Sequence, residues 1–405
     1  MNLRTLILIA PVAVVLACGG STGTGSGSAA LDAATPTFEK LALDQVATDT
    51  AAPSAALEAA PLAAPTAAMA GPGGICHPHL FMREREVVER VNRHIYKVLR
   101  LVELVIATNP VDSTATSKTW TRTEAGVDVS FTITLVGPSV YSWELAAGPT
   151  GITPLPVVMS GEIDRNGYTG EHEGQGTLEV DFAKLHAAFP GERAASGTLE
   201  VRFDVSAAAR KIAVRGTDVT WDLDASKFDG GMVPTGLSAP RSGEYVYYRV
   251  PEKGGSLKIK DEMVFLCGMD PRTANVALVP ADTRMVSRWY RSSDGRVHGR
   301  SDGLITGGNL VAPVDRIVGV TCHDAAADRH MPTEGYWLMK AEDASGATLV
   351  GFDATSMMDT AAVPCDPQLG EVPLLSGPSK DFKDWPVSYF EDPPFPFPGT
   401  PFPGT

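Results

Sequence analysis

The sequence lacks the short motifs that mark several common enzyme classes. It has no P-loop, no Gly-x-Gly-x-x-Gly fingerprint and no Ser-x-x-Lys pair. It also has no His-Glu-x-x-His motif for zinc and no Cys-x-x-Cys-His motif for haem. The motifs therefore favour no enzyme class, and we expect a non-enzymatic protein without a cofactor.

Basic side chains are also scarce. The chain has 34 Lys and Arg against 48 Asp and Glu, which gives a formal net charge of −14 at pH 7. A surface of this sign repels nucleic acid and anionic lipid headgroups. We therefore exclude nucleic acid as a partner, and any attraction to a membrane must come from something other than a basic patch.

The apolar run at the N-terminus is too short to cross a bilayer. It extends from Thr5 to Val15 behind the single cation Arg4, whereas a spanning helix needs about 20 residues. Such a run, followed by small residues, is typical of a cleavable signal. We assign residues 1–17 to this signal, and we expect the next residue, Cys18, to begin the mature chain.

The residues Val15-Leu16-Ala17-Cys18 resemble the lipobox of bacterial lipoproteins. The resemblance implies that the Cys18 thiol receives a diacylglycerol and that the new amino terminus is acylated. It also implies a cell-envelope location, in contact with the membrane through this anchor. Gly19 follows where an Asp would signal retention, which favours the outer membrane of a Gram-negative bacterium. The alternative is an ordinary secretory signal with an incidental cysteine.

Composition divides the mature chain into three parts. Residues 18–75 are rich in Ala, Gly, Ser, Thr and Pro, which predicts a lipidated, disordered stalk. Residues 76–385 form the predicted folded domain. Residues 386–405 contain Pro-Phe-Pro-Gly-Thr twice and are predicted to be a disordered tail, because proline suits neither helix nor central strand. The alternative for the tail is docking into a groove of a partner, as proline-rich ligands do.

Four cysteines remain after Cys18, and an even number in an exported chain predicts two disulfides. Three pairings satisfy this count. We favour Cys267–Cys322 with Cys76–Cys365, because the second bond would join the two ends of the domain.

The folded part begins with a predicted amphipathic helix from about Leu80 to Thr108, which Asn109-Pro110 terminates. Its apolar residues recur every three or four positions. They are Val88, Val91, Ile95, Val98, Val102 and Val105.

The rest of the domain has the pattern of antiparallel strands. Apolar and polar residues alternate from Val127 to Leu135 and again from Tyr141 to Leu145. Asn166-Gly167 predicts a hairpin turn. The segment 176–182 is echoed by 197–203, which we interpret as successive strands of one meander. We predict a mainly β fold, in which an antiparallel meander forms a barrel or a strongly curved half-barrel with the long helix across its concave face.

A second resemblance covers part of residues 286–324. The elements Val-Ser-Arg-Trp, Asp-Gly-Arg, Gly-Arg-Ser-Asp, Gly-Gly and Val-Thr-Cys-His-Asp occur in that order. This order is similar to a pattern in uncharacterised lipoproteins of proteobacteria, with His323 where a tryptophan is common. The resemblance implies a shared β scaffold and no activity.

The leading functional hypothesis is a binding or carrier lipoprotein for an apolar ligand. With the helix stripe, the inward strand residues would line its cavity, and the alternative is that they fill a solid core. These candidates are Val127, Val129, Phe131, Ile133, Tyr141 and Trp143.

Two further hypotheses belong to other classes. One is a structural or interaction lipoprotein that binds an envelope protein. The other is a metal-dependent enzyme, for which the weak ligand candidates are His77, His79, His323 and His330.

Overall fold

The computed structural model describes the greater part of the predicted domain and a short segment before it. The described residues are 26–37, 41, 88, 91–92, 95–96, 99–190, 194–221, 239–251, 254–263, 279–291, 297–308, 310, 312–325 and 333–353.

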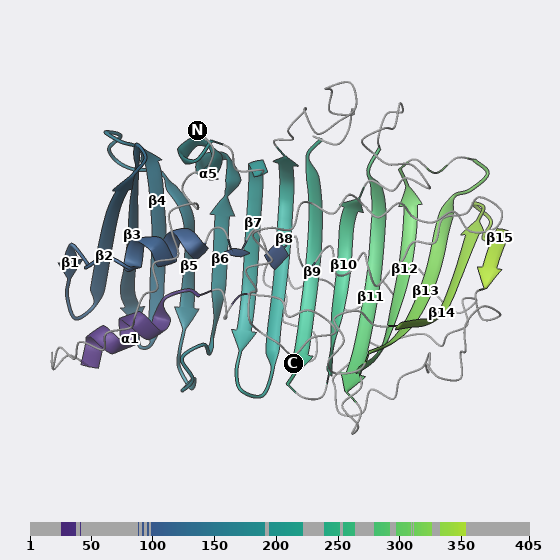
Figure 1. Cartoon of the computed structure of the whole chain (residues 1–405), viewed down its shortest axis with the longest axis horizontal. Coiled ribbons are helices and arrows are strands. Elements are labelled where there is room, and N and C mark those ends of the chain that lie inside the picture. Colours follow the sequence, from purple (N-terminus) through teal and green to yellow (C-terminus); the bar gives the residue numbers. More distant parts are fainter. Residues whose placement is uncertain are drawn as a thin grey trace.

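Antiparallel strands dominate these residues, and Figure 1 shows them side by side in one broad sheet. The strands are β1 (Asp112–Ser113), β2 (Ser117–Glu124), β3 (Val127–Gly137), β4 (Val140–Pro149), β5 (Val157–Asp164), β6 (Gly174–Asp181), β7 (Ala194–Val205), β8 (Arg210–Trp221), β9 (Arg241–Val250), β10 (Gly254–Met263), β11 (Ala281–Arg291), β12 (Val297–Gly307), β13 (Arg316–Ala325), β14 (Thr333–Glu342) and β15 (Thr348–Asp353).

The sheet is a meander, as the sequence predicted. Each strand pairs with its neighbours in the chain, and the order runs from β1 to β15 without a crossover. The two repeated segments are adjacent, because Leu178 of β6 pairs with Val201 of β7. The sheet is not closed, since β1 and β15 are its two edges. The barrel alternative is therefore wrong, and the antiparallel meander is confirmed.

The two faces of the sheet differ over its first half. We call the face that carries Phe131, Trp143 and Leu178 the inner face, and these three side chains are buried. The opposite, outer face carries hydroxyl and charged groups, such as Thr119 and Thr132, whose hydroxyls lie 3.1 Å apart. This division follows from the two-residue period of a strand, which sends alternate side chains to opposite faces.

Strands in the middle of the sheet are buried on both faces. On the outer face of β9 to β11, Val246, Lys258 and Val286 are buried and pair across the strands. On the inner face, Leu257 and Met285 are buried as well. A strand with apolar residues on both sides has a weaker alternation in its sequence than a strand with one wet face.

The predicted helix over 80–108 lies partly outside the described residues. Its stripe residues Val88, Val91, Ile95, Val102 and Val105 are helical and buried where the structure describes them, and Leu99 is buried with them. Val98 is outside the described set. The described stripe contributes to the same core as the sheet, while the full length of the helix stays a prediction.

Helix α1 (Ser26–Ala34) falls within the range for which composition predicted a disordered stalk. Leu31, Ala34 and Leu41 are almost fully buried and belong to the main core. These residues are therefore part of the domain rather than of a free tether. The remaining stalk residues and the predicted tail over 386–405 lie outside the described ranges.

A second helix, α5 (Phe182–Ala188), connects β6 to β7 and begins with a capping carboxylate. The Asp181 side chain accepts a hydrogen bond from the Lys184 backbone N–H at 3.0 Å and an ion pair from the Lys184 Nζ at 2.9 Å. Partial burial opposes the charged form, but these contacts outweigh it and hold the pKa of Asp181 below its usual 3.8.

We expect Asp181→Ala to lower the free energy of unfolding by about 1 kcal/mol at neutral pH, because it removes the N-cap. Since the folded-state pKa is depressed, the ionic part of this contribution is present above the unfolded pKa. It is lost as the pH falls through the folded pKa. Urea titrations at pH 7 and pH 3 measure both effects. Asp181→Asn, which keeps a capping oxygen without a charge, should remove the pH dependence alone, and an equal loss in both variants would contradict this role.

Candidate functional site

The predicted ligand-lining residues all lie on the inner face of β3 and β4. Phe131 and Ile133 have no exposed surface, Trp143 is 1% exposed, and Val129 and Tyr141 are buried. Val127 is half-buried and packs against the same cluster. The structure thus brings the whole predicted set together.

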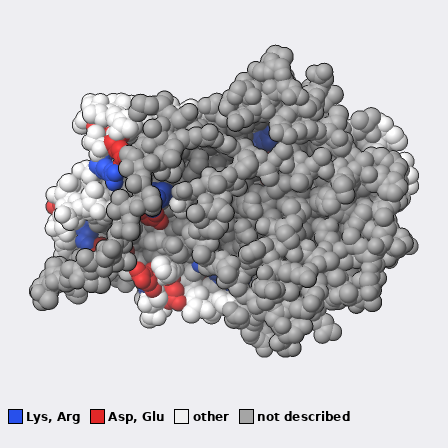
Figure 2. Space-filling model, viewed as in Figure 1, with Lys and Arg blue, Asp and Glu red and all other residues white. Residues whose placement is uncertain are grey.

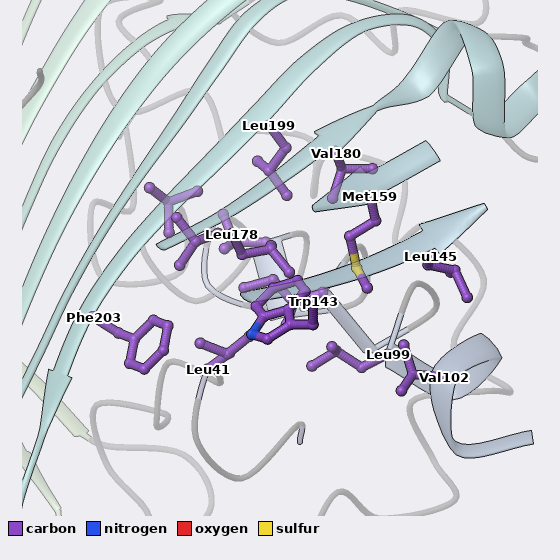
Figure 3. Packing of buried hydrophobic residues seen from close by; sticks show 14 of the residues in the cluster. Leu41, Leu99, Val102, Trp143, Leu145, Met159, Leu178, Val180, Leu199 and Phe203 are labelled. Atoms are coloured by element: carbon purple, nitrogen blue, oxygen red, sulfur yellow. The ribbon is translucent and has the colours of Figure 1, made fainter. Parts of the chain in front are cut away.

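These side chains contact other apolar groups as members of one packed cluster. Figure 3 shows Trp143 surrounded by side chains from several strands, and Leu41 and Leu99 lie next to its ring on the side away from those strands. The rings of Trp120 and Phe131 also lie 5.8 Å apart, centroid to centroid, within the cluster. The inner face over β2 to β8 is therefore covered by residues of the same chain.

Glycines give the large aromatic rings their space on the inner face. Trp143 lies over Gly161 of β5, where a Cβ atom would overlap the indole and the Thr177 carbonyl oxygen. Phe203 lies over Gly176 in the same way, with 2.9 Å to the position of a Cβ atom. Trp289 lies over Gly255 at 2.6 Å from such an atom. Each ring fills the place that a side chain on the neighbouring strand would occupy.

Two cations of the sheet hold α1 against its inner face. The Lys118 Nζ of β2 lies 2.5 Å from the Asp32 carboxylate, and the lysine side chain is only 7% exposed. The Arg165 guanidinium, just after β5, donates to the Ala33 carbonyl at 2.6 Å. Because Arg165 also donates to the carbonyls of Gly170 and Glu171, it ties the β5–β6 turn to α1.

We expect Asp32→Ala to loosen α1, because it takes the carboxylate away from a buried ammonium group. The expected loss is on the order of 1–2 kcal/mol, less than for a fully buried pair because Asp32 is 58% exposed. Hydrogen exchange of the α1 amides measures it. Lys118→Met also removes the ion pair but leaves no buried ammonium group behind, so it should reduce the protection of α1 by less than Asp32→Ala does. Unchanged protection of α1 in both variants would contradict the ion pair's role.

The inner face over β9 to β12 also includes a stretch of buried polar side chains, which the sequence analysis missed. The Tyr245 hydroxyl donates to the Asp261 carboxylate at 2.8 Å, and both residues are buried. Gly243 makes room for this pair, since a Cβ there would lie 2.7 Å from the Tyr245 oxygen. Further along, the hydroxyls of Ser287 and Ser301 lie 2.7 Å apart and are also buried.

This polar stretch can position hydrogen-bonding groups inside the sheet. The signal in the sequence was present as Ser287, Ser301 and Asp261, which occupy inward positions where an apolar residue would continue the pattern.

A second polar group lies on the outer face, at one end of β6 to β9. The Tyr168 hydroxyl donates to Asp204 at 2.8 Å, and the Lys211 Nζ lies 3.6 Å from the same carboxylate. Burial and the contact with Asp204 raise the pKa of Tyr168 well above its usual range. Burial, with the charge of Asp204, also raises the pKa of Tyr248. Both phenols therefore stay protonated at neutral pH, and the Tyr168 hydroxyl donates its hydrogen bond to Asp204.

Most of the predicted cysteine and histidine sites fall outside the described residues. This applies to Cys76, Cys267 and Cys365 and to His77, His79 and His330. Cys322 and His323 lie on β13, where the structure describes the backbone alone. The two disulfides and the metal-ligand candidates stay predictions. Among the side chains that are described, no three His, Cys, Asp or Glu gather closely enough to hold a metal ion.

Among the described helices, none combines the length and the hydropathy that crossing a membrane requires. Comparison of the whole chain with protein-family models, with curated proteins and with solved structures finds no match.

Proposed function

We propose that this protein is a non-enzymatic lipoprotein of the cell envelope, anchored through acylated Cys18, that acts as a structural or protein-interaction component. The observation that carries the proposal is the packing of the inner face. Phe131, Ile133 and Trp143, which would line a ligand cavity, contact other apolar side chains of the chain itself. The surface left for recognition is then the polar outer face over the first half of the sheet.

The anchor and the partner require separate tests. Replacing Cys18 by serine should move the protein from the membrane fraction to the soluble fraction and remove the acyl mass in intact-mass spectrometry. A protein that remains membrane-bound without acylation would contradict the anchor. This result does not depend on what the folded domain binds.

The partner test uses the proline- and phenylalanine-rich tail. Deleting residues 386–405 should abolish a specific crosslink to an envelope protein in cells while leaving the unfolding transition of the domain unchanged. An unchanged crosslink would remove the tail from the proposal. A deletion that lowers the stability of the fold would show that the tail belongs to the domain.

The carrier hypothesis is the second candidate, and one observation favours it. Helical residues of the chain cover the apolar inner face, and two polar contacts near the C-terminal end of α1 help to hold this cover in place. Displacing α1 would expose an apolar surface of the kind that binds lipids.

Native mass spectrometry of the Cys18→Ser chain, followed by solvent extraction, separates the two candidates. The chain must retain α1, because Leu31 and Ala34 are part of the core. The interaction proposal expects an empty, folded protein. A stoichiometric apolar molecule would instead support the carrier and identify its class of ligand. Metal analysis of the same sample tests the metal-dependent alternative.

A further inference from the structure

We infer that the α1 end of the sheet is held at the bilayer surface and that the β15 end projects away from it, an inference that rests on the proposed acylation of Cys18. Eight residue steps separate Cys18 from Ser26, the first residue of α1. Even fully extended, such a segment spans at most about 29 Å. The docked helix, not the whole of residues 18–75, therefore sets the distance between anchor and domain.

The contacts of α1 show which end of the molecule is tethered. Asp32 binds Lys118 on β2, Ala33 binds Arg165 just after β5, and α1 also contacts β3. Figure 1 shows α1 in front of the first strands, at the end of the sheet opposite to β15. With strands about 4.8 Å apart, β15 lies about 65 Å from β1 along the sheet. The short tether therefore holds the α1 end of the sheet near the anchor, and it is too short to bring the β15 end there as well.

The charges of the domain decide how it meets the bilayer. Among the described residues that Figure 2 colours, basic and acidic side chains are mixed at the α1 end. Over β4 to β6 the outer face carries exposed Glu144, Glu162 and Glu179. An anionic bilayer repels this part of the face, which disfavours an orientation with these strands flat on the membrane. The partner of the α1 end is the lipid surface, reached through the acyl chains rather than through basic residues.

Energy transfer to a headgroup dye in liposomes that contain anionic lipid tests this orientation. Full-length acylated protein carries a donor dye, attached through an encoded non-natural residue, at Ser113 or at Ala344. Both positions are exposed. Ser113 pairs with Lys118 beside α1, and Ala344 lies in the turn between β14 and β15. We expect the transfer efficiency at Ser113 to be at least about twice that at Ala344, given the width of the sheet.

A second variant tests the role of the tether length. A Gly/Ser insertion of about 30 residues after Gly23 lengthens the tether but leaves the domain unaltered, and it should reduce the difference in transfer efficiency between Ser113 and Ala344. Equal transfer from both positions in the acylated, unextended protein would overturn the orientation while leaving the lipoprotein proposal intact. Absence of the acyl mass would overturn both, and intact-mass spectrometry of the same sample distinguishes the two failures.

Discussion

Replacing Trp143 by alanine is expected to lower the free energy of unfolding by about 3–5 kcal/mol, the range for a large aromatic lost from a packed core. Trp143 is 1% exposed and belongs to the main cluster. Its ring lies over Gly161, which has no side chain to fill the space that the ring would leave. The cavity would therefore stay open. Urea unfolding of the Cys18→Ser chain, followed by circular dichroism, measures the change.

Two neighbouring variants make this prediction specific. Glu144 is the next residue in β4 and is exposed on the outer face, so Glu144→Ala should change stability by no more than about 0.5 kcal/mol. Trp143→Phe loses volume but also removes a buried indole N–H that has no hydrogen-bond acceptor among the described residues. Trp143→Phe should therefore lower the free energy of unfolding by less than Trp143→Ala does. Equal losses in Trp143→Ala and Glu144→Ala would show that the inner face is not the core.

The strands were predictable because one wet face leaves a two-residue period in the sequence. Val129, Phe131 and Ile133 were assigned inward from alternation alone, and all three are buried. Asn166-Gly167 was assigned to a turn, and Gly167 there has a φ of +83°. These features depend on neighbours in the chain, so local composition contains them. Closure of the sheet depends on whether β1 meets β15, and no local pattern records that.

Helix α1 was not predictable, because its order, like the closure of the sheet, depends on residues that are distant in the chain. Its sequence, Ser-Gly-Ser-Ala-Ala-Leu-Asp-Ala-Ala, has one large apolar residue and resembles the low-complexity sequence around it. What orders it is distant in the chain. Leu31 enters the core, and Asp32 pairs with Lys118, 86 residues away.

The candidate site shows the same limit. The predicted lining residues are together on the inner face, but their packing against α1 and the helical residues 99–106 could not be read from the strands. The polar stretch with Tyr245 and Asp261 was missed because a single carboxylate in a strand is usually on a solvated face. Pairing across β9 and β10 places it inside.

A methyl group at position 161 is expected to destabilise the sheet by about 1–3 kcal/mol, the usual range for overpacking. In Gly161→Ala the new Cβ meets the backbone carbonyl of Thr177 as well as the indole of Trp143. The indole can shift within the core, but the carbonyl belongs to the paired strand β6 and moves only with it. The matched control is Gly137→Ala in β3, where the nearest atom would be 3.5 Å away, an ordinary contact. Urea midpoints of the two variants measure the difference.

The double variant Trp143→Ala with Gly161→Ala separates the two contacts. If the Trp143 ring caused the whole loss of stability in Gly161→Ala, this substitution would not destabilise a chain that already lacks the ring. The new methyl group would instead fill part of the cavity. Because the Thr177 carbonyl remains in place, we expect a smaller cost rather than none, with a coupling of about 0.5–3 kcal/mol between the sites. Strictly additive losses would mean that the ring does not touch position 161. The sheet would then tolerate its large rings for a reason other than the glycine on the neighbouring strand.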